Sequence, residues 1–411
     1  MSLRDIRIDG ERLLESLERL ALVGMTEDGA CCRLALTDED RVGRDLVTGW
    51  MREAGLQVHI DPIGNIFGVR PGRDNVAAVM TGSHIDTVRT GGHYDGNLGV
   101  LGGLEVVRTL NAAKITTRRP LVVAAFTNEE GARFQPDMLG SLVYAGGLAL
   151  DDAYATRSVD GKKLIDELER IGYHGNAPMP YCVPEAFVEL HIEQGPVLDI
   201  EGGLIGAVRD LQGISWQEIT IVGQSNHAGT TPMRLRHDAG YSAGAIAVCV
   251  RQIAREMGGA QVGTTGAIQL HPNLINVIAA RATITVDLSN TDEEQLQESE
   301  RRLAAFLSTL ARDEGVQISA RTLARFEPVR FDAQVADLIT ETAMQLGMDC
   351  RPMTSGAGHD AQMMARLCPT AMIFVPSVKG ISHNPAEHTE PAHLVAGANL
   401  LLHTLLELAD R

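Results

Sequence analysis

Four short, uninterrupted apolar segments constrain the fold of this chain more than any other feature of its sequence. They lie at 76–80, 121–126, 187–190 and 371–375, and longer stretches with helical patterns separate them. Apolar runs of this length are typical of strands that are buried on both faces. Such strands usually form a parallel sheet that is covered by helices. We therefore predict an α/β fold built on a mostly parallel sheet.

Two helices are predicted ahead of the first of these strands. Leucines recur with an approximately helical period between 9 and 24, among Glu and Arg. A second helix is predicted to begin after Thr37, which can act as the N-cap of an acidic first turn, and to end near Gly55.

Residues 212–325 follow a different pattern and are predicted to form a separate domain. Ile284, Val286 and Leu288 alternate with polar neighbours, which is typical of strands with one solvent-facing side. Two helices are expected at 237–257 and 292–314, with inward residues Tyr241, Ala245, Val248 and Ile253 in the first and Leu296, Leu303, Leu307 and Leu310 in the second. We thus expect an α/β domain from 1–211 plus 326–411 and a smaller α+β domain inserted at 212–325.

The charge and cysteine content of the chain exclude some classes of partner. The 36 Lys and Arg against 53 Asp and Glu give a net charge of −17, which would repel nucleic acid or an anionic membrane. We find no apolar stretch that approaches the roughly 20 residues of a membrane span, and no signal-peptide core near the N-terminus. The six cysteines form no CxxC pair, so we expect free thiols and a cytoplasmic protein.

Metal-binding residue types follow each of the four predicted strands. His84, the pair Glu129 and Glu130, His191 and His383 lie within or after the loops that leave these strands. In open α/β sheets, ligands bind outside the carboxyl ends of the strands, so these side chains could converge in space. Two or three imidazoles and several carboxylates at one edge would suit zinc or a similar divalent ion.

Each of these residues also has a simpler interpretation when it is taken alone. His84 could be a core or surface histidine, and Glu129 with Glu130 could be a solvated loop pair. Asp95 could be the N-cap of a helix over 98–110. Their combination favours the metal site. Because neighbouring residues cannot easily aim both carboxylates at one ion, we expect one of the two glutamates to ligate and the other to act as a general base.

Six segments, in order along the chain, resemble the M20-type metallopeptidase/amidohydrolase group. They are His-Ile-Asp-Thr-Val at 84–88, Gly-Gly-His-Tyr-Asp-Gly-Asn-Leu-Gly-Val at 91–100, Asn-Glu-Glu-Gly at 128–131, Glu-Leu-His-Ile-Glu-Gln-Gly-Pro-Val-Leu at 189–198, His-Ala-Gly-Thr-Thr-Pro-Met at 227–233 and Ser-Gly-Ala-Gly-His-Asp-Ala at 355–361. Within that group they are similar to the hydantoinase/carbamoylase branch, which holds N-carbamoyl-L-amino-acid hydrolases, β-ureidopropionase and allantoate amidohydrolase. The resemblance covers nearly the whole chain.

The resemblance implies a role for individual residues and an activity. It implies a pair of divalent ions (Zn, Mn, Co or Ni), held by His84, Asp95, Glu130, His191 and His383, with Asp95 bridging the two. It implies that Glu129 is the general base and that the Asp86 carboxylate orients the His84 imidazole. It implies substrate contacts from Gln194, His227, Asn276 and the backbone around Gly358, while His359 could touch substrate or brace its loop. It also implies a homodimer, in which His227 of the inserted dimerisation domain reaches the partner's active site. The implied reaction is hydrolysis of a linear C–N bond in a carbamoyl, ureido or amide substrate.

One position departs from the family pattern and bears on the substrate. Relatives carry an arginine that holds the substrate carboxylate where this chain has Ser289. Either the substrate lacks that carboxylate, or another basic group takes the role, with Arg281, Arg209 and Arg234 as the candidates. The usual proline of the preceding segment is replaced by Ala279.

Two rival functions remain to be separated from the carbamoylase interpretation. An aminoacylase or dipeptidase of the same superfamily would use the same ions, but many such relatives carry an acidic ligand where this chain has His191. A non-catalytic binding protein on the same scaffold would be expected to have lost a ligand or the base, and all six positions are intact.

Overall fold

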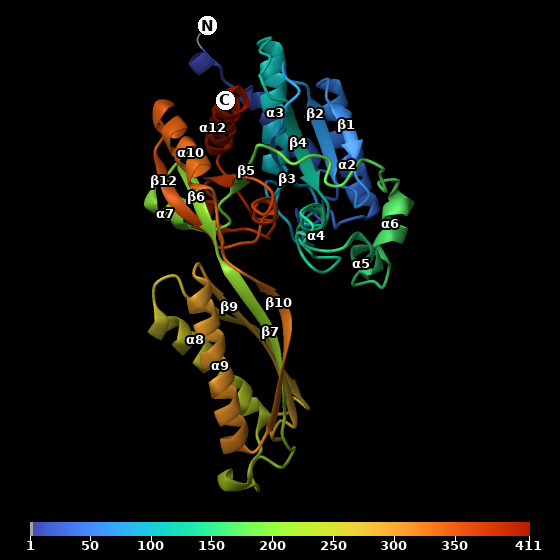
Figure 1. Cartoon of the computed structure of the whole chain (residues 1–411). Helices are drawn as coiled ribbons and strands as arrows, with labels where there is room; N and C mark the ends of the chain where they lie inside the picture. The colour runs from blue at the N-terminus through green and yellow to red at the C-terminus, as the bar shows by residue number, and fades with distance from the viewer. Residues whose placement is uncertain (1–2) are drawn as a thin grey trace. The chain divides into compact units, whose positions relative to one another are not determined.

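The computed structural model describes residues 3–411, and the chain divides into two compact units (Figure 1). The first unit ends at Arg209 and resumes at Arg330, and the second unit is Asp210–Val329. The insertion expected at 212–325 lies inside the second unit.

The first unit is built on a nine-stranded sheet with the order β1-β2-β4-β3-β5-β13-β6-β11, and β12 pairs with β6. The four central strands, β4, β3, β5 and β13, run parallel, while β1 and β2 on one side and β6 on the other pair antiparallel. The bounds are β1 Gln57–Ile60, β2 Ile66–Arg70, β3 Val79–His84, β4 Leu121–Phe126, β5 Ala186–Ile192, β6 Ile205–Leu211, β11 Val329–Arg330, β12 Cys350–Ser355 and β13 Thr370–Val375. Every residue of the four central strands is buried. Three of the predicted apolar segments lie within these strands, whereas the segment predicted at 76–80 overlaps only the start of β3, and Val76 and Ala77 are exposed.

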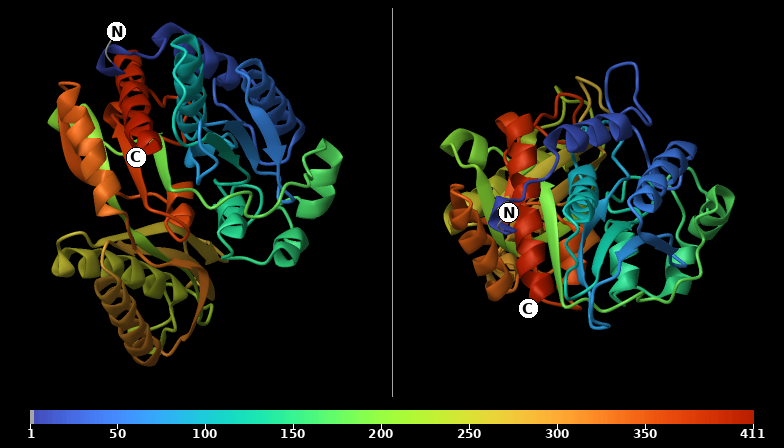
Figure 2. Two further views of the ribbon diagram at one scale, coloured as in Figure 1. Left: turned by 45° about the horizontal axis from the view of Figure 1, so that its top comes forward. Right: turned by 90° about the horizontal axis from the view of Figure 1, so that it is seen from above.

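Helices cover both faces of this sheet (Figure 2). Successive residues of a strand point to opposite faces. Leu190 of β5 packs against the glycines of α3, while the Glu189 carboxylate accepts a hydrogen bond from the backbone N–H of Ala361 in α11. Thus α3 and α11 lie on opposite faces. The helices of this unit are α1 Gly10–Ala21, α2 Asp38–Glu53, α3 Asn97–Ala112, α4 Leu139–Tyr144, α5 Leu150–Ala155, α6 Leu164–Ile171, α7 Val197–Glu201, α10 Ala333–Gln345, α11 Asp360–Met364 and α12 Pro391–Asp410.

Helices α2 and α12 of this unit bear on two inferences from the sequence, the cap at Thr37 and the absence of a membrane span. The Thr37 side chain caps α2 by accepting a hydrogen bond from the Asp40 backbone N–H, as predicted. Helix α12 is long and apolar enough by composition to cross a membrane. It packs against α3, β5 and β13, and 72% of its most apolar stretch is buried inside the protein. It is therefore a core helix of this unit.

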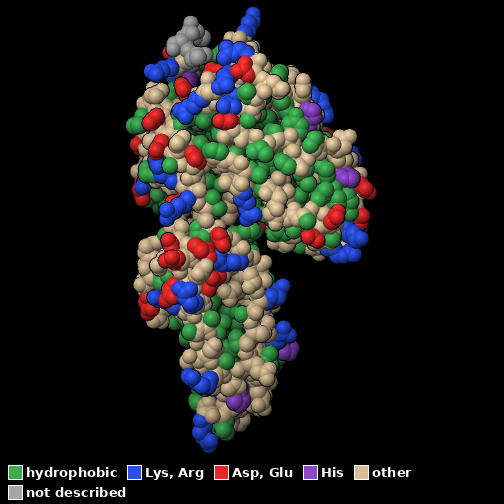
Figure 3. Space-filling view, in the orientation of Figure 1, with side chains coloured by type: hydrophobic (Ala, Val, Ile, Leu, Met, Phe, Trp, Pro, Cys, Tyr) green, Lys and Arg blue, Asp and Glu red, His purple; other side chains and the backbone are tan. Residues whose placement is uncertain are grey.

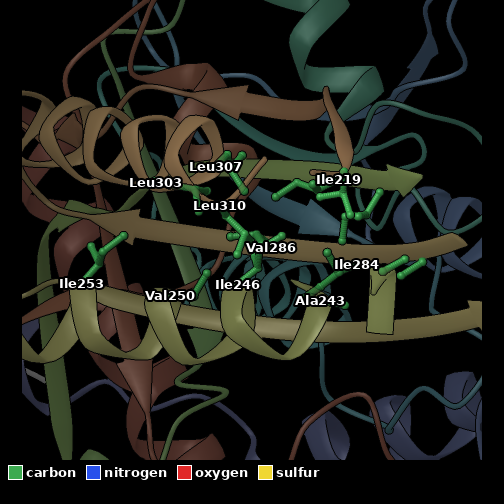
Figure 4. Close-up of a cluster of buried hydrophobic side chains, with 14 of the residues drawn as sticks. Ile219, Ala243, Ile246, Val250, Ile253, Ile284, Val286, Leu303, Leu307 and Leu310 are labelled. Carbon is green, nitrogen blue, oxygen red and sulfur yellow. The ribbon is translucent and has the colours of Figure 1, made fainter. Parts of the chain in front are cut away.

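The second unit is a four-stranded antiparallel sheet with two helices on one face. Its strand order is β10-β7-β9-β8, with bounds β7 Gly213–Val222, β8 Val262–His271, β9 Arg281–Asn290 and β10 Gln317–Phe326. The helices are α8 Ala239–Met257 and α9 Glu293–Glu314. On the face shown in Figure 3, hydrophobic side chains of this unit lie among groups of charged ones. Figure 4 shows its core, where the two helices meet the sheet.

The inward face was predicted correctly for α9 but only in part for α8. Leu296, Leu303, Leu307 and Leu310 of α9 are buried. In α8, Ile253 is buried as predicted, but Tyr241 and Val248 are exposed by 58% and 66%, and the helix buries Ala243, Ile246 and Val250 instead. Because apolar and small residues occur around the whole circumference of α8, its sequence fits more than one inward stripe. The side of α8 that is buried is the one whose side chains pack against Ile219, Ile284 and Val286 of the sheet.

Candidate functional site

The candidate site lies at the carboxyl edge of the parallel strands of the first unit. His84 is the last residue of β3, and His191 lies next to the end of β5. Glu129 and Glu130 follow β4, and His383 follows β13 after a longer loop. Because β4, β3, β5 and β13 are parallel neighbours, their carboxyl ends bring these residues together.

Asp95 occupies the centre of this group. Its Oδ1 atom is 3.2 Å from His191 Nε2 and 3.7 Å from His84 Nε2. Its Oδ2 atom is 3.2 Å from Nε2 of His383, and His383 Nε2 is also 3.2 Å from Glu130 Oε2. The two carboxylate oxygens of Asp95 therefore face two different sets of ligand atoms.

These side chains form two groups of three that share Asp95. The first is His84, Asp95 and His191, the second is Asp95, Glu130 and His383, and within each the ligand atoms lie within 4.8 Å of one another. Imidazole and carboxylate donors in this combination suit zinc and similar divalent ions. Asp95 does not take the alternative role of N-cap of α3, because the N-cap is Gly96, without a side-chain hydrogen bond, and the Asp95 carboxylate faces His191 and His383.

Glu129 has surroundings that differ from those of its neighbour Glu130. It belongs to neither group of three, and its Oε2 atom lies 3.4 Å from His84 Nε2. Asn128, immediately before it, has a positive φ of 56°, which is uncommon for a residue other than glycine. The Glu130 carboxylate instead lies beside His383, so the two adjacent carboxylates face different partners, as the predicted division of roles requires.

Asp86 supports the site in a way that differs from the expected one. The His84 Nδ1 atom is 2.9 Å from the backbone carbonyl of Asp86, so the carbonyl, not the carboxylate, orients this imidazole. The Asp86 carboxylate instead accepts hydrogen bonds from the backbone N–H groups of Glu129 and Glu130, at 3.2 and 3.3 Å. The reason is geometric, since His84 still lies within β3 and its ring turns toward the chain that leaves the strand. Asp86 therefore ties the His84 segment to the loop that carries both glutamates.

Glu387 is a buried residue of the site that sequence reasoning missed. Its Oε1 atom accepts hydrogen bonds from the backbone N–H groups of Tyr94 and Asp95, and its Oε2 atom accepts one from the Ser382 hydroxyl. It thereby joins the loop of Asp95 to the loop of His383. Burial, together with the nearby Asp95 carboxylate, raises the pKa of Glu387 to about 7. No strand or motif in the sequence marks this position.

Replacing Glu387 with alanine is expected to weaken metal binding by about 10–100-fold, because residues that orient metal ligands commonly have effects of this size. Glu387→Gln should retain most of the affinity, since its amide oxygen can accept from the backbone and its NH2 group can donate to Ser382. Metal affinity would be measured by competition with a chelator. Equal affinities for wild type and Glu387→Ala would contradict this positioning role.

Two further buried side chains, those of His359 and Glu189, lie close to His191. The His359 ring is 4.5 Å from the His191 ring, centroid to centroid, and its Nε2 atom is 2.9 Å from the Ser355 hydroxyl. Glu189 accepts from the Ser83 hydroxyl and from the Ala361 backbone N–H. Of the two roles considered for His359, these contacts match bracing of its loop. Glu189 was part of a recognised segment, but the sequence alone gave it no role.

The electrostatics of the site explain why it suits cations. Burial lowers the pKa of His84 to about 4, so this imidazole is neutral and free to ligate at neutral pH. Burial also lowers the pKa of His191, but the Asp95 carboxylate outweighs it and the resulting pKa is raised to about 9. Burial and the neighbouring carboxylates of Asp360, Glu130 and Asp95 raise the pKa of Glu129 well above its usual range. Divalent cations would offset this concentration of buried negative charge.

The predicted substrate contacts of the first unit lie beside this group. Gln194 Nε2 donates to Asp95 Oδ2 at 2.9 Å, while its buried Oε1 atom has no hydrogen-bond partner among the described residues. That oxygen is available to accept a hydrogen bond from a ligand. Gly358 lies in the loop before α11, next to His359.

The other predicted contacts belong to the second unit. His227 is exposed, and its Nδ1 atom accepts from the backbone N–H groups of Gly229 and Thr230. Its segment is adjacent to that of Asn276, since the Ala228 N–H donates to the Asn276 carbonyl at 2.9 Å. Ser289 lies at the far end of β9, where its hydroxyl donates to Asp287 Oδ1 at 2.9 Å, so it faces the polar side of the strand as predicted.

Comparison with known proteins identifies the family. Residues 80–407 match the model of peptidase family M20/M25/M40. The chain is 41% identical to an N-carbamoyl-L-amino-acid amidohydrolase of Rhizobium meliloti, over 98% of this chain and 97% of that protein. It is 35% identical to the allantoate amidohydrolase of Escherichia coli, over 96% of this chain and 97% of that protein.

A solved structure agrees with these relatives. The crystal structure of an amidase of the hydantoinase/carbamoylase family from Burkholderia multivorans superimposes with a TM-score of 0.94 at 44% identity and covers 99% of both chains. The chain therefore belongs to peptidase family M20/M25/M40 and groups within it with the hydantoinase/carbamoylase amidases.

Proposed function

We propose that this protein is a metal-dependent amidohydrolase that cleaves a linear, non-peptide C–N bond of a carbamoyl, ureido or amide substrate. The observation that carries the proposal is the Asp95 carboxylate, which faces a His–His set with one oxygen and a Glu–His set with the other. The named relatives, which include carbamoylases, an allantoate amidohydrolase and a ureidoglycolate hydrolase, act on bonds of this class. Their names favour this reaction over the aminoacylase or dipeptidase alternative.

Different residues of the chain would perform different parts of the reaction. His84, Asp95 and His191 would hold one divalent ion, and Asp95, Glu130 and His383 the other, with Zn, Mn, Co and Ni as the candidates. Bound divalent ions lower the pKa of water toward neutrality and polarise the attacked carbonyl. Glu129 accepts the proton of the attacking water and then donates it to the leaving nitrogen. Gln194 Oε1 is free to orient an N–H group of the substrate.

His227 is suited to stabilise the oxyanion of the tetrahedral intermediate. Because its Nδ1 atom accepts two backbone hydrogen bonds, the proton of the neutral ring lies on Nε2. This leaves Nε2–H as a donor toward developing negative charge. We propose that His227 acts in the active site of a partner subunit, and that the protein is a homodimer.

The second unit offers a surface for that dimer. β8 is an edge strand of its sheet, and Val262, Ile268 and Leu270 along it are exposed. A groove of about 950 Å³ lies along α8 and α9, lined by apolar side chains such as Val248 and Phe306. Unpaired edges and apolar grooves of this kind are usually covered in the assembled protein.

Subunit mixing tests whether His227 acts in the partner's site. Glu129→Gln and His227→Ala should each be nearly inactive alone. If His227 acts across the interface, one of the two sites in each mixed dimer combines an intact Glu129 with an intact His227 from the other subunit. Random mixing makes about half of the dimers mixed, so about a quarter of wild-type activity returns. If mixed dimers form, as shown by exchange of labelled subunits, and no activity returns, His227 acts within its own subunit.

Ser289 bears on which end group the substrate carries. Of the candidate replacement arginines, Arg209 is 2.6 Å from Asp337 of the first unit, and Arg281 begins β9 at the end opposite Ser289. Neither of these two positions favours a role beside Ser289, while Arg234, exposed in the short 3-10 helix Met233–Leu235, stays a candidate. We propose that the substrate lacks the carboxylate that carbamoyl amino acids present, or presents it elsewhere.

Ser289→Arg is expected to raise kcat/KM for N-carbamoyl amino acids by about tenfold, because a bidentate charge-assisted contact contributes on this scale. The steady-state kinetics of wild type and variant on the same substrates would be compared, with Ser289→Lys as a control for charge without the planar fork. Efficient hydrolysis by wild type together with no gain in the variant would contradict the proposal.

A substrate screen tests the reaction class itself. Purified protein loaded with Mn or Zn would be assayed for ammonia or amine release from ureido acids, acyl amino acids and uncharged amides. We expect chelator-reversible turnover of ureido or amide compounds. Turnover of acyl amino acids or dipeptides alone would favour the aminoacylase alternative, and metal binding without any turnover would favour a binding protein.

We further propose that the protein resides in the cytoplasm. All six of its cysteines are free thiols in the structure, with Cys31 and Cys368 buried. Free thiols without disulfides are typical of a reducing compartment.

A further inference from the structure

A separate pocket lies on the open face of the sheet in the second unit. It has a volume of about 300 Å³ and is lined by Trp216, Thr264, Thr285, Asp287 and Leu323, among others. Helices α8 and α9 cover the opposite face of the same sheet, where the hydrophobic core lies. Its size is at the small end of the range for ligand pockets, about 300–1,000 Å³.

The backbone of the sheet builds this pocket. Asp287 of β9 lies directly opposite Trp216 of β7 on one side and opposite Thr264 of β8 on the other. The register is interrupted by a bulge between Thr265 and Ile268 in β8 and by another between Thr322 and Ala324 in β10. Bulges redirect side chains out of the regular pleat. The pocket therefore lies between two irregular strands, with Leu323 contributed by the second bulge.

Among the described residues that line the pocket, Asp287 alone has a charged side chain. It is partly buried, and the Ser289 hydroxyl and the Trp216 side chain both hydrogen-bond to its carboxylate. A carboxylate accepts about four hydrogen bonds, so it has capacity left for a ligand. Burial raises the pKa of Asp287. A partly desolvated carboxylate attracts a cation more strongly than an exposed one does.

The other residues that line the pocket favour an organic cation over a metal ion as its ligand. A calcium or magnesium site would need several oxygen ligands, and the pocket has a single carboxylate. The indole of Trp216 and the side chain of Leu323 provide apolar surface, and an indole face also attracts cations. We propose that this pocket binds the ammonium or guanidinium end of a small organic cation, with the carbon chain of the ligand against Trp216 and Leu323. The proposal does not depend on the hydrolase activity.

Trp216 provides a direct readout of binding. The chain contains two tryptophans, of which Trp216 is 36% exposed and Trp50 is buried. In full-length Trp50→Phe protein, the emission of Trp216 would be followed during titration with butylammonium and with butylguanidinium. Butyrate and butanol serve as the anionic and neutral probes. We expect saturable binding of the two cations and none of the other two.

Matched substitutions locate the binding to this pocket. Asp287→Asn keeps an acceptor oxygen for Ser289 and should weaken cation binding at least about tenfold, because a charge-assisted contact is lost. Glu218→Gln removes an equal charge from the same sheet face outside the pocket, where Glu218 lies 3.1 Å from Arg321, and should change the affinity by no more than about twofold.

The opposite outcomes would overturn the proposal. These are equal binding of butyrate or butanol, or unchanged cation affinity in Asp287→Asn. Should Trp50→Phe fail to fold, calorimetric titration of the wild type, Asp287→Asn and Glu218→Gln gives the same comparison.

Discussion

Glu129→Gln is expected to lower kcat by about 10³-fold, the scale of effect of a positioned general base, while metal content stays near that of the wild type. The amide has the shape of the carboxylate but cannot accept the proton of the attacking water. Retained metal is expected because Glu129 belongs to neither set of metal-binding side chains. The measurement is kcat together with metal content by mass spectrometry on the same preparation.

The adjacent glutamate is the matched control for this experiment. Glu130 Oε2 lies 3.2 Å from His383 Nε2 within the second group of three, so Glu130→Gln should lose metal along with activity. If Glu129→Gln instead lost metal in proportion to its rate, Glu129 would be a ligand and the division of roles between the two residues would be wrong.

Asp95→Ala is expected to remove both of the proposed metal ions and to lower activity to background, because its two oxygens face both ligand sets. Each remaining set would have only two protein ligands, His84 with His191 and Glu130 with His383. Structural and catalytic zinc sites generally need three or four protein ligands. Metal content after dialysis, read beside the rate, is the measurement.

A surface aspartate controls for the general effect of removing a carboxylate. Asp74 is exposed and pairs with Arg118 at 3.0 Å, so Asp74→Ala should retain both metal and rate. Circular dichroism would establish that Asp95→Ala is folded. A folded Asp95→Ala protein that keeps two equivalents of metal would contradict the bridging role.

Predictions that rest on strand periodicity agree closely with the structure. The apolar segment 121–126 is β4 itself, and the segments 187–190 and 371–375 lie within the buried strands β5 and β13. The segment 76–80 overlaps only the start of β3, and the polar residues Thr81, Ser83 and His84 complete that buried strand. A strand in the middle of a sheet is buried on both faces, so an apolar run in the sequence predicts a central strand. The resemblance to a known family then named the side chains at the ends of those strands.

Local patterns were less informative where several structures satisfied them equally. The apolar residues of α8 surround the helix, so the choice between Tyr241 with Val248 and Ile246 with Val250 depended on which stripe the sheet accepts. Asp95 has the sequence of an N-cap, yet its carboxylate is directed to His191 and His383. In both cases partners distant in the sequence outweigh the local preference.

The sequence by itself predicted the parallel sheet and the inserted unit, because hydrophobic periodicity is a local property of the chain, and the resemblance to a known family supplied the predicted metal ligands. Only the tertiary structure decided how these residues are supported. Glu387 joins two loops through backbone hydrogen bonds, and Asp86 uses its carbonyl for His84 and its carboxylate for the glutamate loop. A buried polar group takes whichever partners the fold brings within about 3 Å, and no sequence pattern records that distance.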